Sequence, residues 1–118
     1  MYWRSFRKAI DMRLVFVALL LLSGSVDADE LSRGKAVYEQ TCIACHGSNG
    51  KSSIPGVANL SQKGGPLSKS DAELLSSIKD GLQRPGAVMT MPPKGGNPNL
   101  TDQDVSAVLL YLRQEFQR

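Results

Sequence analysis

The stretch Cys-Ile-Ala-Cys-His at residues 42–46 decides how this chain folds, because it holds both cysteines and the only histidine of the 118 residues. Two cysteines separated by two residues and followed at once by histidine form the attachment signature of a c-type haem. At about 100° per helical residue, Cys45 lies about 60° to one side of Cys42 and His46 about 40° to the other. All three side chains therefore project from one helix face. Two thiols there can bond to the vinyl groups of a porphyrin, and the imidazole then reaches the iron.

Three other uses of these residues compete with haem attachment. A redox-active disulfide between Cys42 and Cys45 is typical of folds that place the motif near a βαβ unit, a pattern that this sequence lacks. A tetrahedral zinc site needs four ligands, and residues 29–118 contain no other cysteine or histidine. A structural disulfide across only two residues would be strained. We therefore predict one haem c, covalently attached through Cys42 and Cys45, with His46 as an iron ligand.

Residues 1–28 have the pattern of an export signal peptide and are set apart from the folded domain. Their basic residues are Arg4, Arg7, Lys8 and Arg13. Residues 14–22 form an unbroken apolar run of nine, which is too short for the roughly 20 residues that cross a bilayer. Small residues before position 29 then offer a cleavage site. We expect a cut after Ala28, a periplasmic location and no transmembrane segment in the mature chain.

Two alternatives stay open for this segment. Translation from Met12 would give a shorter signal with the same apolar run. A signal that is not cleaved would tether the protein to the membrane instead of releasing it.

The net charge of the chain falls once the signal is set aside. The whole chain carries 14 basic and 11 acidic residues, of which residues 1–28 hold four and two. Ten basic and nine acidic residues are left in 29–118, a net charge of +1. No run of like charge and no basic patch with interleaved aromatics is left, so nucleic acid is not expected as a partner. A chain this short buries only a modest core, so we expect a bound group to help fill it.

Apolar spacing and capping residues predict three helices in the mature chain. The first covers residues 29–46 and runs into the cysteine motif, with apolar residues at steps of three and four. The second opens with a capping box, Ser70 with Glu73 three residues on, and ends at Gly81. Its apolar side consists of Leu74, Leu75 and Ile78.

The third helix begins after Thr101, which is expected to cap it, and Asp104 in its first turn interacts favourably with the helix dipole. Leu100 before the cap and Val105 inside the helix fit a hydrophobic staple. One apolar stripe then follows the helix: Val105, Val108, Leu109, Leu112 and Phe116. This stripe predicts a face that packs into the core, with Tyr111 beside it.

Two long loops connect the expected helices. Residues 47–69 and 82–99 are rich in glycine and proline and lack apolar periodicity. Loops of this length in a small domain usually have a function, such as wrapping a ligand. The sequence contains no internal repeat and no convincing strand pattern. The predicted fold class is therefore all-α, with three main helices and long loops wrapped around one covalently attached haem.

The second loop supplies the candidates for a further iron ligand. Electron carriers commonly use methionine in this position, and residues 29–118 contain two, Met89 and Met91. Methionine more often serves as flexible core filler, but no apolar stripe surrounds either residue. Pro92 and Pro93 stiffen the chain beside Met91. We therefore predict Met91, rather than Met89, as the second ligand of the iron.

The quoted residues resemble the bacterial class I c-type cytochromes, which are small single-haem electron carriers. Gly34 and Tyr38 match that family's pattern of a glycine followed by an aromatic. Residues 42–47 (CIACHG) match its attachment site, and residues 91–96 (MPPKGG) resemble its methionine-ligand loop. The resemblance implies a cytochrome c domain over residues 29–118. It also implies that the first helix packs against an aromatic of the last, which Tyr111 would supply.

One position departs from the family's pattern. The family usually has Pro-Asn-Leu about a dozen residues after the haem histidine, whereas this chain has Ala58-Asn59-Leu60. In the family, the proline carbonyl accepts a hydrogen bond from the second ring nitrogen of the histidine. Ala58 also has a carbonyl, so we expect the same bond to His46.

The function expected from these residues is one-electron transfer between exported redox proteins, without enzymatic activity. Histidine and methionine together would fill both axial positions of the iron and leave none for a substrate. Contacts with the electron donor and acceptor would be small and transient. Two alternatives stay open: a haem-bearing subunit of a larger dehydrogenase or oxidase, and an open-iron haem enzyme or gas sensor in which neither methionine binds.

Overall fold

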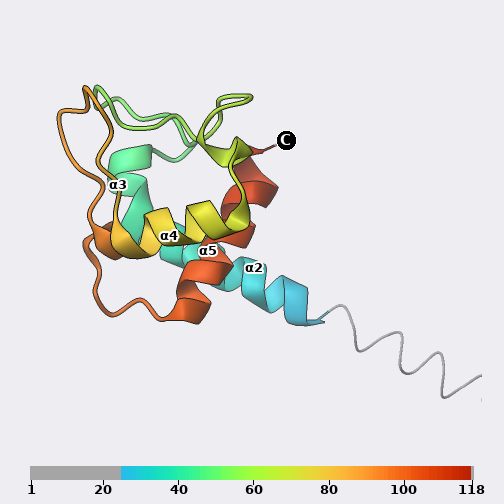
Figure 1. Cartoon of the computed structure of the whole chain (residues 1–118). Helices are drawn as coiled ribbons and strands as arrows, with labels where there is room; N and C mark the ends of the chain where they lie inside the picture. Colours follow the sequence, from blue (N-terminus) through green and yellow to red (C-terminus); the bar gives the residue numbers. More distant parts are fainter. Residues whose placement is uncertain (1–24, 118) are drawn as a thin grey trace, which may run out of the picture.

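The computed structural model describes residues 25–117, which form helices joined by long connections (Figure 1). Its helical elements are α2 (Ser25–Val37), a π-helical turn (Tyr38–Cys42), α3 (Ile43–His46), a 3-10 turn (Pro66–Ser68), α4 (Asp71–Asp80), a second 3-10 turn (Pro93–Gly96) and α5 (Asp102–Phe116). Within the described residues there is no strand, and Leu82 and Met91 form an isolated β-bridge. The all-α prediction with two long loops is therefore confirmed.

The first helical run differs from the expected uniform helix over residues 29–46. It begins four residues earlier, at Ser25, so the predicted cut after Ala28 falls inside α2. It also widens after Val37, where the N–H of Ile43 donates to the carbonyl of Tyr38 five residues earlier. Such π-helical turns are rare and often occur at functional sites. Here the turn ends at the first cysteine of the motif.

Helices α2 and α5 cross at very short distance. A Cβ atom built on Gly34 would lie 2.0 Å from the carbonyl oxygen of Ala107 and 2.9 Å from the Cβ of Tyr111. One turn further on, the Tyr38 ring packs against two aromatic rings of α5, with centroids 5.5 Å from Tyr111 and 5.3 Å from Phe116. The packing of the first helix on an aromatic of the last is therefore confirmed, and Phe116 joins it.

Replacing Gly34 by alanine should destabilise the protein. The new methyl group would overlap the backbone of α5, and the two helices would have to move apart. We expect a loss of about 2 kcal/mol in the free energy of unfolding, even though alanine favours helix formation by about 1 kcal/mol over glycine. Guanidinium unfolding of the haem-loaded protein measures this loss. Ser32→Ala, at an exposed position of α2, is the control and should change the stability by less than about 0.5 kcal/mol. A Gly34→Ala protein as stable as the wild type would contradict the close crossing.

Capping boxes begin both α4 and α5. The hydroxyl of Ser70 accepts from the Glu73 N–H at 3.3 Å, and the Glu73 carboxylate accepts from the Ser70 N–H at 3.0 Å. The Thr101 hydroxyl accepts from the Asp104 N–H at 3.1 Å, and the Asp104 carboxylate accepts from the Thr101 N–H at 2.9 Å. The first box was predicted. In the second, aspartate takes the place of the usual glutamate or glutamine, so Asp104 makes a direct bond where only a dipole interaction was expected.

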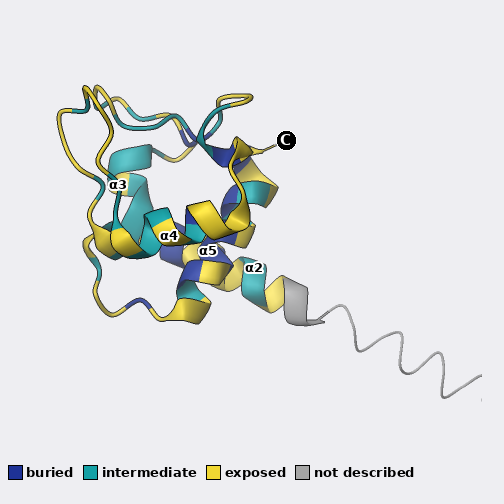
Figure 2. Cartoon of the chain, in the orientation of Figure 1, coloured by how far each residue is buried: buried dark blue, intermediate teal, exposed yellow. Residues whose placement is uncertain are grey.

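The core lies where α5 packs against α2 and α4 (Figure 2). The predicted stripe of α5 is buried along its whole length, and Val105 and Val108 are at most 1% exposed. Leu100, just before the cap of α5, is buried with Val105 as the staple predicts. The remaining buried apolar side chains of the cluster are Val37, Tyr38, Leu60, Leu67, Leu74, Leu109, Leu112 and Phe116.

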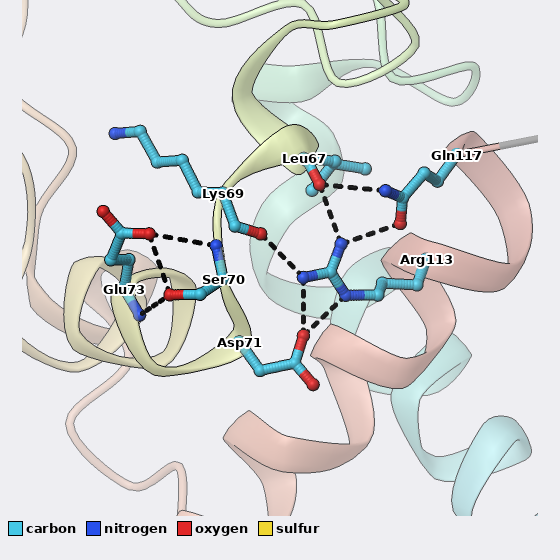
Figure 3. A network of polar contacts seen from close by, with 7 residues as sticks. All are labelled: Leu67, Lys69, Ser70, Asp71, Glu73, Arg113 and Gln117. Carbon is cyan, nitrogen blue, oxygen red and sulfur yellow. Dashed lines mark hydrogen bonds and ion pairs between the residues drawn. The ribbon is translucent and has the colours of Figure 1, made fainter.

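Arg113 of α5 ties the segment before α4 to the last helix (Figure 3). Its Nε and Nη2 atoms lie 2.6 and 2.5 Å from the Asp71 carboxylate. It also donates to the backbone carbonyls of Leu67 at 2.7 Å and Lys69 at 2.9 Å. The Gln117 side chain donates to the same Leu67 carbonyl at 3.1 Å. This fork of charge-assisted bonds holds the end of the first long loop against α5.

Candidate functional site

A cleft with two adjoining lobes lies between α3, α4 and the two long loops. The outer lobe has a volume of about 230 Å³ and is bounded by loop 84–92. The inner lobe has a volume of about 90 Å³ and is bounded by core side chains such as Leu74 and Val108. The residues that line both lobes are Cys42, His46, Ala58, Leu82, Met91 and Gly95. The walls are mostly apolar, as a cleft for a large planar ring requires.

All four predicted site residues come together in this cleft. Cys42, Cys45 and His46 reach it from the π-helical turn and α3. Met91 reaches it from the second long loop, 45 positions after the histidine in the sequence. One wall of the cleft therefore carries two thiols and an imidazole from the helical segment. A distant loop adds a thioether to the same cleft.

The two cysteines are partly buried and are not joined by a disulfide. Burial, and to a smaller extent the neighbouring Cys45, raises the pKa of Cys42 to about 11. The thiol form therefore dominates at neutral pH. Redox-active Cys-x-x-Cys pairs have the opposite property, a lowered thiol pKa. The environment of Cys42 thus argues against the disulfide oxidoreductase alternative.

His46 is oriented by a bond from its ring to the first long loop. Its Nδ1 atom lies 3.2 Å from the carbonyl oxygen of Ala58. Burial lowers the pKa of His46, and the bond to Ala58 opposes this effect only in part. The ring is therefore neutral at pH 7, and with the Nδ1–H donated to Ala58 its Nε2 lone pair is available to a metal. The expected bond to the Ala58 carbonyl is confirmed.

Met91 is held by its backbone. It exchanges two hydrogen bonds with Leu82, both 3.0 Å long, which pair it with the first residue of the second loop. Gly81, which links α4 to Leu82, has φ of +80° and leaves no room for a side chain. A Cβ there would lie 2.6 Å from the Met91 carbonyl oxygen. The end of α4 thus fixes the position of Met91 along the cleft.

The two methionines differ in their surroundings. Met91 is half-buried and lines both lobes, whereas Met89 is 46% exposed and lines only the outer lobe. The neighbouring Val88 is 70% exposed. Met91 therefore meets the geometric needs of a buried ligand better than Met89 does.

Two features of the site were not predicted from the sequence. The pairing of Leu82 with Met91 has no periodic signal, because it is a single bridge between loop residues. The hydroxyl of Tyr38 donates to the Gly47 carbonyl at 2.6 Å and ties the π-helical turn to the end of the motif. The family's glycine and aromatic pattern points to Tyr38 as a packing residue, but it does not indicate this bond.

The donor set fits a haem. Imidazole and thioether are the axial ligands of electron-transfer haems, and soft sulfur suits iron in its reduced state. Two thiols one helical turn apart, on the face that also carries the imidazole, suit covalent attachment along one porphyrin edge. Among the described residues no group of three or more histidine, cysteine, aspartate or glutamate side chains could hold a metal ion by itself.

Comparison with known proteins decides the family. The family model for cytochrome c matches residues 31–115. The chain belongs to the cytochrome c family. It is similar to cytochrome c-555 of Chlorobaculum tepidum, with 33% identity over 80% of this chain and 85% of the relative. Cytochrome c-555 of Prosthecochloris aestuarii is 30% identical over 76% of this chain and 92% of that protein. No solved structure gives a significant match.

Membership of the family has three consequences for this cytochrome. Its fold is the cytochrome c fold, as predicted. It carries covalently bound haem c, for which a Cys-x-x-Cys arrangement is present at Cys42 and Cys45. It is a monohaem electron carrier and not an enzyme. Within residues 25–117, none of the helices has the length and apolar character that a membrane span needs.

Proposed function

We propose that this cytochrome is an exported carrier of single electrons whose haem is bonded to Cys42 and Cys45 and whose iron lies between His46 and Met91. The observation that carries the proposal is that these four residues line one cleft, with the histidine and the methionine on different segments of its wall. The haem supplies the redox chemistry, a reversible change of one electron at the iron.

The protein's own residues prepare the cleft for that task. Ala58 fixes the His46 ring through Nδ1, at 3.2 Å, so that Nε2 can bind the metal. Leu82 fixes the backbone of Met91 through the two bonds of the β-bridge. Because both ligand residues are anchored in this way, the iron site needs little rearrangement when the charge changes. Small rearrangement favours rapid electron exchange with a partner.

A sulfur ligand also shifts the reduction potential of the haem. A thioether stabilises the reduced iron better than a second imidazole does and raises the reduction potential. With His46 and Met91 both bound to it, the iron would have no open position for a substrate or a gas. The partners that this chemistry requires are redox proteins, and the contacts with them would be transient.

Export is the second part of the proposal. Residues 1–28 carry the basic start, the apolar run and the small-residue site of a signal peptide. The family domain, matched over residues 31–115, begins just after them. Residues 1–24 lie outside the described residues, so the sequence pattern alone supports this part.

The experiment that tests the proposed function is a redox titration of the protein purified from the periplasmic fraction, together with its intact mass. We expect a reversible one-electron transition and a mass equal to residues 29–118 plus one haem. A mass that includes residues 1–28 would favour a tethered protein. A protein that is not reversibly reduced by one electron, or that turns over a substrate, would contradict the carrier function.

A further inference from the structure

Lys94 adopts a backbone conformation that lysine rarely adopts. Its φ and ψ angles are 55° and 30°, and it is the one non-glycine residue with positive φ in the described range 25–117. Gly95 and Gly96 follow in the same region, with φ of 62° and 86°. Left-handed backbone costs energy for a residue with a long side chain, since lysine lacks the short polar group that lets asparagine and aspartate adopt it. Residues held in such strained backbone conformations cluster at functional sites.

The side chain of Lys94 spans from the methionine loop to the start of α5. Its Nζ donates to the carbonyl oxygen of Leu100 at 2.8 Å in a partly buried position. Leu100 belongs to the core and precedes the cap residue of α5. The bond therefore holds the ammonium group at a defined place against a rigid part of the fold.

The positive charge of Lys94 has no carboxylate partner within the described residues. The ion pairs found there use the cations Arg33, Lys35, Lys79 and Arg113. A neutral carbonyl satisfies one N–H of the ammonium but leaves its net charge in place. Lys94 therefore brings an uncompensated positive charge to its surroundings.

Those surroundings are the cofactor cleft. Lys94 lines the inner lobe together with His46 and Met91. Charges interact more strongly beside an apolar, partly buried cleft than in bulk water, because the effective dielectric constant is lower. Oxidation of the iron adds one positive charge inside this cleft. The ammonium of a residue that lines this cleft would repel that added charge.

We propose that Lys94 tunes the reduction potential, with its ammonium favouring the reduced iron and so raising the potential. The inference deepens the proposed function and rests on the placement of the haem in this cleft. A role for its charge explains why lysine, and not glycine, occupies the left-handed position before Gly95 and Gly96. A glycine at position 94 would relieve the strain and lose the charge.

The test compares three variants of the haem-loaded protein: Lys94→Met, Lys94→Arg and Lys63→Met. The first removes the charge and keeps a side chain of similar length. The second keeps the charge at the same left-handed position. The third removes an exposed lysine outside the lining of the cleft. Spectroelectrochemistry gives the midpoint potential, and the absorption spectrum of the oxidised form reports the sulfur ligand.

In Lys94→Met we expect the equilibrium constant for reduction by a given redox mediator to fall severalfold. The oxidised form should keep the sulfur band, the weak far-red charge-transfer band that a sulfur ligand of the iron produces. Lys94→Arg and Lys63→Met should stay within about twofold of the wild type, because one keeps the charge and the other removes a charge screened by water. An unchanged potential in Lys94→Met would overturn the inference. So would loss of the sulfur band, because Lys94 would then act by positioning Met91.

Failure of the proposed function has a different signature. If the wild-type protein lacks the sulfur band, ligation by Met91 is wrong whatever Lys94 does. The comparison of Lys94→Met with Lys94→Arg still decides the charge effect in that case, because it depends on the haem position and not on the sixth ligand.

Discussion

Met91→Ala should lower the reduction potential and open the iron to carbon monoxide. Without the thioether, the iron loses the ligand that favours its reduced form, and the vacated position becomes available to small ligands. We expect a fall on the order of 0.1–0.2 V, part of the roughly 0.8 V range that axial ligands span. The haem should stay attached, because the cysteines are untouched. Spectroelectrochemistry and carbon monoxide titration of the reduced protein measure both effects.

Met89→Ala is the matched control for this prediction. Met89 is exposed and lines only the outer lobe, so its removal should leave the potential and the ligand binding nearly unchanged. If Met89→Ala shows the large effects and Met91→Ala does not, the ligand is Met89 and the carrier function is unaffected. If neither variant differs from a wild type that binds carbon monoxide readily, the iron is open and the carrier function fails.

The paired variant Cys42→Ala and Cys45→Ala should lose covalent haem completely. Both thiols line the outer lobe of the cleft, and the chain contains no other cysteine. A denaturing gel stained for haem should therefore show no signal at the mass of the protein. Each single variant should retain a reduced amount, because one thioether bond can still hold the ring.

Ala44→Ser is the control for the cysteine variants. Ala44 lies between the cysteines but is exposed and outside the cleft lining, so the haem stain should be retained at the level of the wild type. A paired variant that carried haem through the denaturing gel would show that attachment occurs elsewhere.

Local sequence signals predicted the helices of this cytochrome well. The Ser70 and Glu73 capping box, the end of α4 at Gly81 and the buried stripe of α5 all follow from short-range patterns. Such patterns are reliable because the bonds that they describe join residues within one or two turns. The resemblance to class I cytochromes added two contacts outside the reach of such patterns, the packing of Tyr38 on Tyr111 and the bond between His46 and the Ala58 carbonyl.

Several details that depend on tertiary packing were not predicted. The π-helical turn keeps Tyr38 in the core while Thr41 and Cys42 line the cleft, which no spacing rule anticipates. Arg113 reaches the Leu67 carbonyl 46 positions earlier in the chain, and the bridge from Leu82 to Met91 is a single pairing inside the second loop. These contacts arise only when the helices have packed. The sequence motifs therefore indicated residues that meet in one cleft, and tertiary packing determines how they are held.

The absorption spectrum of the oxidised wild-type protein is the most direct test of the central claim that the iron lies between His46 and Met91. A sulfur ligand gives a weak far-red charge-transfer band, which is absent when the sixth position is open or holds nitrogen. We predict that this band is present and that the reduced protein binds carbon monoxide poorly. A spectrum without the band, together with rapid binding of carbon monoxide, would contradict the proposed ligation and favour an open iron.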